Sequence, residues 1–479
     1  MSRETTKDIV ILGGSFAGIS AAHHFLKDTV DKLRVTRTAP SYRVVLISPS
    51  THIYWNIGAP RGIVSPTWLP QNDLFVPIIP AFRRYPINRF HFIQGTATSV
   101  DMFARRVHVE LHTPRAAGDH KPRGSVDSQN RWSTGSKGSK GSVTQSIEFH
   151  ALIIATGTYA EDSLYSLHGP HDDTLAALNE FHNAIPNAEG IIVAGGGPSG
   201  VETAGQLATY FNRPSRTNRG PITALMNARP KFLKGRLSRH ELSTRKPKTI
   251  TLISGNDRLL PRLPLALGQQ AEKSLESLGV HIIHNTRVVS AAQTPGGKMR
   301  VVLNNDITIT ADLYVAATGV RPNTNFLPPE MLDASKYVST DPNYLRVTRP
   351  PPGGMVYCIG DCATYSKNYI LDVYEAVPVL MHNLRNDLLV WELRDQNPYG
   401  GKEEEIAALQ EADMRYVQNP TDSQLMPITR WGGVGVLYGM KLPGWMVYAM
   451  KGRDYRIAKA KLVAGQGHNP YAPDTYIYK

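Results

Sequence analysis

A glycine-rich turn in the middle of the chain is the segment whose residue types point most directly to chemistry. The apolar run 191–194 predicts a buried strand, and Gly195, Gly197 and Gly200 follow it at G-x-G-x-x-G spacing before a helix expected over 201–207. In such a turn one glycine makes the tight bend, one lets a pyrophosphate approach the backbone, and one allows the helix to pack on the strand. The unpaired N–H groups at the beginning of the helix then hold the diphosphate.

The same succession of strand, glycine turn and helix is expected near the N-terminus, over residues 8–22. Gly13 and Gly18 occupy the first and third glycine positions, while Ser15 stands where the second glycine is usual. Serine is a small departure, and its hydroxyl can itself bond a phosphate oxygen. A plain strand–helix turn would explain one such segment alone, but two copies favour two dinucleotide-binding units.

Three further short motifs follow expected strands. An Ala-Thr-Gly sequence ends two of them, at 155–157 and at 317–319, and a Gly-Asp pair at 360–361 ends a third. In this order the motifs resemble those of the two-dinucleotide-binding-domain flavoproteins, also called pyridine nucleotide-disulfide oxidoreductase-like. Within them the chain is similar to the apoptosis-inducing-factor-like group, which includes the ferroptosis suppressor flavoprotein and is related to type II NADH dehydrogenases. The resemblance covers nearly the whole chain, and its C-terminal GGVGVLYG…LPGWMVYAMKGRDY is like the terminal segment of that group.

The resemblance implies that the first turn binds FAD and the second binds NAD(P)H. For FAD it implies contacts from Gly13, Gly14, Ser15, Phe16, Ala17, Gly18, Ser48, Arg61, Ala97, Ala155, Thr156, Gly157 and Asp361. For NAD(P)H it implies contacts from Gly195, Gly197, Gly200 and Glu202, the last near the nicotinamide. It requires no catalytic side chain, because the cofactors carry the chemistry.

For three of these residues, the sequence is also compatible with a role other than cofactor binding. Glu202 lies in the first turn of a helix, where the helix dipole favours an acid. Asp361 suits the position of a helix N-cap, and Arg61 suits an exposed position on the aromatic-rich loop 51–61.

The choice between NADH and NADPH depends on the residue that ends the second strand of the nucleotide unit. An acid there binds the ribose hydroxyls and repels a 2′-phosphate, whereas an arginine attracts the phosphate. The first unit ends this strand at Ser48 and the second at 254–256, both without an acid, although Arg258 lies nearby. We therefore expect weak discrimination, within about tenfold, or about 1.4 kcal/mol.

Cysteine usage argues against two other kinds of chemistry. The disulfide reductases of this superfamily use two cysteines beside the flavin in the first domain, but this chain has only Cys358 and Cys362, late in the sequence. Their C-x-x-x-C spacing is not the C-x-x-C of thioredoxin-type chemistry, so we expect small buried side chains and no disulfide reductase. No Cys/His cluster has zinc-ligand spacing, so no metal is expected.

The net charge of +13 is concentrated in two segments, 114–146 and 212–248, and the rest of the chain is nearly neutral. We expect 114–146 to be a disordered insertion and 212–248 a basic insertion, because neither has enough apolar residues for a core. Such segments are typical of solvated loops, with docking to an anionic membrane or partner as the alternative, and nucleic acid is not an expected partner.

With 479 residues the chain is long enough for several domains. The expected fold is α/β, with two Rossmann-like units, the NAD(P)H domain inserted in the FAD domain, and a small C-terminal α+β region. We expect the FAD domain over 1–185 and 326–390, the NAD(P)H domain over 186–325, and a C-terminal interface or membrane-proximal region over 391–479.

The resemblance implies an FAD-dependent oxidoreductase that passes a hydride from NAD(P)H to flavin and two electrons to a quinone-like acceptor. Two alternatives stay open: an oxidoreductase of a biosynthetic pathway acting on a small aromatic metabolite, and a redox-sensing flavoprotein that acts through partner binding. Turnover with a quinone would distinguish the last from the enzymes.

The sequence also predicts where the protein resides. It has no secretory signal and no apolar run long enough to span a bilayer, and Ser2 replaces the glycine that N-myristoylation needs. We expect a cytoplasmic protein or one peripheral on an intracellular membrane. The apolar segment 434–450 is expected to pack on the protein's own core or in a homodimer, or to meet a membrane or an incoming quinone.

Overall fold

The computed structural model describes residues 6–33, 40–112, 143–212, 246–349 and 354–472. Most of the two basic segments lies outside these residues. The described residues correct the C-terminal boundary that was expected for each of these segments. Residues 144–146 belong to a strand, and Lys248 is buried, with its Nζ donating to the carbonyl oxygens of Pro186 and Ala188.

The first sheet has seven strands in the order β18-β8-β1-β2-β5-β6-β7. Their bounds are β1 (Thr6–Leu12), β2 (Ser41–Ser48), β5 (Phe90–Asp101), β6 (Arg106–Leu111), β7 (Thr144–Glu148), β8 (Ala151–Ile154) and β18 (Val356–Cys358). The five strands from β18 to β5 run parallel, and β6 and β7 extend the edge as an antiparallel meander. Strand β1 is apolar on both sides, because Ile9 and Ile11 face one core and Val10 and Leu12 the other.

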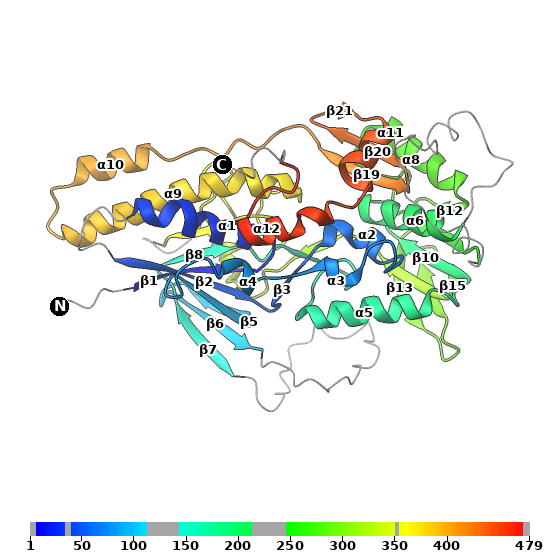
Figure 1. Ribbon diagram of the computed structural model, residues 1–479, viewed down its shortest axis with the longest axis horizontal. Coiled ribbons are helices and arrows are strands. Elements are labelled where there is room, and N and C mark those ends of the chain that lie inside the picture. The colour runs from blue at the N-terminus through cyan, green and yellow to red at the C-terminus, as the bar shows by residue number, and fades with distance from the viewer. Residues whose placement is uncertain (1–5, 34–39, 113–142, 213–245, 350–353, 473–479) are drawn as a thin grey trace.

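Helices α1 (Phe16–His24), α9 (Ile370–Gln396) and α12 (Ala460–Gln466) lie together on one face of this sheet (Figure 1). Near the C-terminus the chain is tied to α1 by two buried hydrogen bonds, from Ser20 Oγ to the Gly467 oxygen (3.0 Å) and between His23 Nε2 and the Ala464 oxygen (2.8 Å).

The second sheet has four parallel strands in the order β12-β11-β10-β16. They are β10 (Gly190–Ala194), β11 (Thr249–Ile253), β12 (Val280–Ile283) and β16 (Leu313–Ala316), with helices α5 (His171–Ala184), α6 (Pro198–Phe211) and α8 (Leu265–Ser277). An antiparallel meander follows: β13 (Val288–Gln293), β14 (Met299–Leu303) and β15 (Thr308–Ala311). The whole unit lies at the opposite end of the molecule from β7 and α10 (Figure 1).

Two short crossing strands connect the sheets. β9 (Thr158–Ala160) leaves the first sheet after β8, and β17 (Val320–Pro322) returns after β16; the two pair in antiparallel fashion. The second sheet is therefore built from residues between β9 and β17. The expected α/β class with two Rossmann-like units is confirmed, and the residue limits of the domains stay predictions.

The C-terminal residues form a small sheet that packs on the second unit. Its strands are β19 (Gln424–Thr429), β20 (Gly432–Leu437) and β21 (Met440–Lys441), followed by α11 (Gly444–Val447) and η6 (Tyr448–Gly452), while α10 (Glu403–Glu411) lies at the far end of α9. Gly205 on α6 lets β19 approach, since a Cβ there would lie 2.5 Å from the Ile428 oxygen. No helix in the described parts of the chain is both long and apolar enough to cross a bilayer.

Candidate functional site: two glycine turns and the cavities between them

Steric constraints explain why two positions of the first turn are glycine. Gly13 has a φ of +112°, and a Cβ on it would lie 2.2 Å from the Ala155 oxygen. A Cβ on Gly18 would lie 1.8 Å from the Gly13 oxygen. Neither contact is with a side chain that could move away, so only glycine fits both positions. The Ala-Thr-Gly segment follows β8, directly beside the turn.

The second turn repeats this geometry residue by residue. Gly195 has a φ of +124° and would place a Cβ 2.0 Å from the Ala317 oxygen, and Gly200 would place one 1.9 Å from the Gly195 oxygen. Gly197 differs, because nothing lies within 4 Å of its Cβ position. Packing therefore does not require a glycine here, and the open space fits the approach of a pyrophosphate to the backbone. Ser15 holds the matching position in the first turn; it is exposed and its side chain caps no N–H group.

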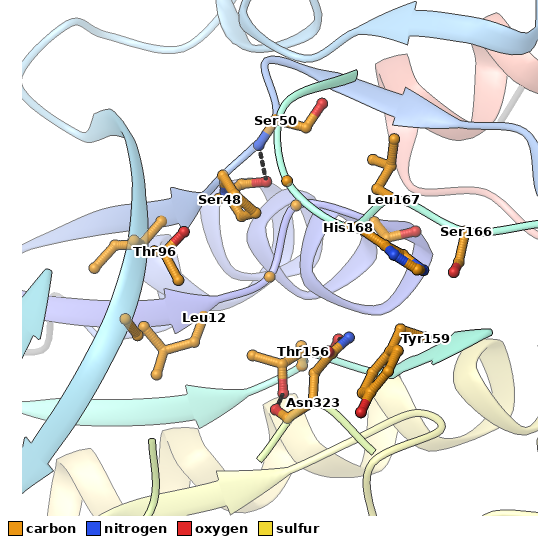
Figure 2. A pocket seen from close by; sticks show the side chains of 18 of the residues that line it. Leu12, Ser48, Ser50, Thr96, Thr156, Tyr159, Ser166, Leu167, His168 and Asn323 are labelled. Carbon is orange, nitrogen blue, oxygen red and sulfur yellow. Dashed lines mark hydrogen bonds between the residues drawn. The ribbon is translucent and has the colours of Figure 1, made fainter. Parts of the chain in front are cut away.

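The first turn opens into a cavity of about 490 Å³. Figure 2 shows Ser48, Thr96, Thr156, Tyr159 and His168 around it. The predicted FAD residues that line it are Gly13, Gly14, Ser15, Ser48, Ala97, Ala155 and Thr156. The predicted residues Phe16, Ala17, Gly18 and Gly157 do not line it, and their contacts with FAD stay predictions.

Ser48 and Ser254 hold corresponding places at the ends of β2 and β11. A Cβ on Gly14 would lie 2.7 Å from Ser48 Oγ, and one on Gly196 would lie 2.4 Å from Ser254 Oγ. Each hydroxyl also accepts a hydrogen bond from the backbone N–H two residues later. Ser48 Oγ accepts from Ser50 and Ser254 Oγ accepts from Asn256, both at 3.3 Å. The two serines are thus packed against the glycine turns, and a ribose contact from Ser48 stays a prediction.

A second cavity of about 750 Å³ lies at the second turn. Four predicted residues line it, namely Gly195, Gly197, Glu202 and Asp361, whereas Gly200 does not. Asn56, Thr158 and Ser166 line both cavities, so the two meet at these residues. Local sequence does not indicate this junction, because Asn56 begins a short turn after β3 (His52–Tyr54), whereas Thr158 and Ser166 lie on the distant segment from β9 to α5.

Asp361 follows β18 and brings a carboxylate from the first sheet to the second cavity. Burial and the neighbouring Asp372 raise its pKa to about 6. Cys358 and Cys362 flank it, and their sulfur atoms lie 3.6 Å apart. Both cysteines are free and fully buried and line neither cavity, which confirms the expectation of small buried side chains.

Glu202 meets a partner that the sequence did not indicate. Its Oε1 accepts a bond of 2.7 Å from Lys451 Nζ, which also donates to the Leu425 oxygen at 3.0 Å. Both Glu202 and Lys451 line the second cavity. Burial raises the pKa of Glu202, and the lysine opposes that shift. The pair puts one anion and one cation at the wall where the C-terminal sheet meets α6.

Arg61 is buried rather than exposed, so the surface alternative is wrong. It lies on α2 (Ala59–Gly62), within the segment expected as a loop. Its Nε donates to Gln206 Oε1 (3.0 Å) and its Nη1 to the Arg453 oxygen (3.1 Å), while its guanidinium stacks on Tyr455 at 4.5 Å. Arg61 lines neither cavity. It joins the first unit to α6 and to the C-terminal segment, and the predicted flavin contact gains no support.

Comparison with known proteins agrees with this geometry. Residues 7–379 match the family model described as pyridine nucleotide-disulphide oxidoreductase. The chain belongs to this family. It is 32% identical over 467 residues to the oxidoreductase phnG of Penicillium herquei, covering 95% of this chain and 96% of that protein.

Two further relatives match over most of the chain. Apoptosis-inducing factor 1 of Saccharomyces cerevisiae is 23% identical over 390 residues, which cover 80% of this chain and 81% of that protein. Among solved structures, NDH2 from Plasmodium falciparum in complex with NADH shares the fold, with a TM-score of 0.57, 14% identity and 96% of each chain covered. The expected superfamily is thereby confirmed. As a member of this family the chain is a flavoprotein oxidoreductase with FAD and NAD(P)H as cofactors, which the two turns fit.

Proposed function

We propose that the protein oxidises NAD(P)H and passes two electrons through FAD to a quinone-like acceptor. The observation that carries the proposal is the pair of cavities, each built on its own glycine turn, that meet at Asn56, Thr158 and Ser166. Two cofactors bound in them would come together at that junction. A small aromatic metabolite of a biosynthetic pathway is the alternative acceptor, and a redox-sensing role through partner binding is the alternative function.

When bound, FAD supplies the redox chemistry by accepting a hydride from NAD(P)H and releasing electrons to the acceptor. The chain's own residues would bind and orient the two cofactors. The N–H groups at the beginnings of α1 and α6 would hold the two pyrophosphates, and Ser15 and Gly197 are the turn residues directly before these helices. Glu202 and Lys451 give the wall of the second cavity a pair of opposite charges whose side chains are 3% and 14% exposed.

The cysteines support a role other than disulfide reduction. A dithiol that exchanges electrons with flavin must reach it, and Cys358 and Cys362 line neither cavity. Burial also holds the pKa of the Cys358 thiol well above its ordinary value, which disfavours a thiolate at that residue.

Anaerobic spectroscopy tests the proposal. The purified protein should be yellow, should be bleached by NADH or NADPH, and should recover its colour when a water-soluble quinone is added. Fast bleaching with a persistent reduced state that quinones do not reoxidise would favour the sensing role. A colourless protein that does not take up added FAD would contradict the proposal.

Replacing Asp361 with alanine should weaken retention of FAD by about tenfold or more. The carboxylate is the acid that follows β18 and lines the second cavity, and the resemblance assigns it to the ribityl or phosphate part of FAD. Retention is measured as the ratio of flavin to protein absorbance after dialysis against a chaotropic salt. Asp372→Asn is the matched control, since it alters the neighbouring acid, which lines neither cavity. Full retention in Asp361→Ala would exclude this role.

The C-terminal segment 434–450 divides into a buried and an exposed part. Val434, Leu442 and Val447 are buried, as expected for packing on the protein's own core. Met440 and Trp445 are instead 65% and 63% exposed. We propose that this exposed part, with Lys441 beside it, contacts a membrane surface where a long-tailed quinone is found. A homodimer contact is the alternative occupant.

Trp445→Glu should abolish binding to anionic liposomes and reduce activity with a long-tailed quinone severalfold, while a water-soluble quinone is reduced at the normal rate. The added carboxylate opposes insertion at the headgroup level. The matched control is Tyr399→Glu, because Tyr399 is even more exposed than Trp445 but lies between α9 and α10, at the far end of the molecule (Figure 1). Unchanged liposome binding in Trp445→Glu would remove the membrane proposal.

A further inference from the structure

The nucleotide end of the second cavity holds an arginine that the sequence did not single out. Arg287 lies between β12 and β13 and lines the cavity together with Gly255 and Asn256, which follow β11. In a dinucleotide-binding unit the end of this second strand faces the adenosine ribose and reads its 2′ position. The arginine comes from the neighbouring connection rather than from the strand end itself.

Backbone hydrogen bonds fix that connection against the end of β11. The N–H of Thr286 donates to the Ser254 oxygen (2.9 Å), and the N–H of Asn285 donates to the Asn256 oxygen (3.1 Å). The N–H of Arg287 itself donates to Asn304 Oδ1 at 3.0 Å. The backbone from which the arginine projects is therefore held on both sides.

The arginine stem lies directly over Gly255. A Cβ on that glycine would lie 2.9 Å from Arg287 Cγ and 3.0 Å from its Nε. Gly255 thus leaves the space that the stem occupies, and the guanidinium is kept at the strand end, where many nucleotide-binding units carry an acid.

The charges around this end also favour an anion. Among the described residues that line the second cavity, the carboxylates are Glu202 and Asp361, and Glu202 is already paired with Lys451. The nearby Arg258 is engaged elsewhere, since its Nη2 donates to the Pro261 oxygen at 2.6 Å. No described residue forms an ion pair with Arg287.

We propose that Arg287, seated over Gly255, binds the 2′-phosphate of NADPH and makes the protein select NADPH over NADH. This rests on the proposed function and replaces the expectation of weak discrimination. A guanidinium can donate two hydrogen bonds to one phosphate group, whereas the 2′-hydroxyl of NADH offers it no charge.

Equilibrium binding of NADP⁺ and NAD⁺ to the FAD-loaded protein tests the inference without turnover. The wild-type protein should bind NADP⁺ more than tenfold more tightly. Arg287→Ala should weaken NADP⁺ binding by about tenfold or more, which is 1.4 kcal/mol, and change NAD⁺ binding less than twofold. Gly255→Ala, which crowds the stem, should act in the same direction.

Two controls keep the inference falsifiable. Arg258→Ala tests the other nearby arginine, and Arg300→Ala removes an exposed arginine of β14 that lines neither cavity. Neither variant should change the ratio of the NADP⁺ affinity to the NAD⁺ affinity. Equal wild-type affinities for the two nucleotides, or loss of the ratio in Arg258→Ala instead, would overturn the inference. Failure of both nucleotides to bind the wild-type protein would instead overturn the proposed function.

Discussion

Replacing Gly18 with alanine should yield a folded protein that is purified without FAD. The new Cβ would lie 1.8 Å from the Gly13 oxygen, a backbone atom, so α1 must move away from the turn. That movement shifts the N–H groups at the beginning of α1, which are the ones expected to hold the pyrophosphate. The ratio of flavin to protein absorbance should fall to near zero, and added FAD should not restore it.

The matched variant is Gly200→Ala, which introduces the same clash, at 1.9 Å, in the second turn. It should remain yellow but no longer be bleached by NAD(P)H, although a chemical reductant still bleaches it. The two variants together separate the roles of the turns, because each serves as the folding control of the other. A Gly18→Ala protein with full flavin content, or a Gly200→Ala protein that still accepts hydride normally, would contradict the assignment.

Replacing Lys451 with methionine should destabilise the protein by about 3 kcal/mol near pH 8, because removing one partner of a buried pair leaves the other charge uncompensated. Glu202 is 3% exposed, and Lys451 lies 2.7 Å from it. The methionine keeps most of the volume of the lysine stem, so the loss of charge dominates the effect. The free energy of unfolding is measured by urea denaturation of the FAD-loaded protein.

The effect of Lys451→Met should grow with pH. Burial raises the pKa of Glu202 above its ordinary value of 4.5, and Lys451 opposes this. Without the lysine the pKa rises further, so the folded state holds a proton that the unfolded chain releases. The free energy of unfolding of the variant therefore falls as the pH rises from 4.5 through the raised pKa, and the difference from wild type is smaller at pH 5 than at pH 8.

The double variant Glu202→Gln/Lys451→Met is the control, since it removes both charges. It should recover most of the stability and lose the pH dependence that is specific to the single variant. A single variant as stable as wild type at pH 8, or one whose deficit is the same at pH 5, would show that the pair carries no net electrostatic stabilisation.

Some of this site follows from local sequence alone. A backbone that turns from a strand into a helix beside a second chain segment has room only for glycine. The glycines at positions 13, 18, 195 and 200 therefore indicate such turns. The Ala-Thr-Gly segments that follow β8 and β16 mark the segments crossing below the turns. The positive φ of Gly13 and Gly195, and the clashes that a side chain at Gly18 or Gly200 would make with them, are set within a few residues. The α/β class and the two nucleotide units could therefore be predicted before any distant contact was known.

The other features depend on where distant segments meet. Lys451 lies 249 residues from Glu202, and nothing in either segment indicates the pairing. Arg61 and Lys248 are long cations that a sequence pattern assigns to the surface, yet each is buried because backbone or side-chain oxygens from other elements accept its N–H groups. Arg287 reaches the end of β11 only because neighbouring parallel strands align their connections at one edge of the sheet. Residue type sets which turns can form, whereas the partner of each buried charge is decided by the packing of the whole chain.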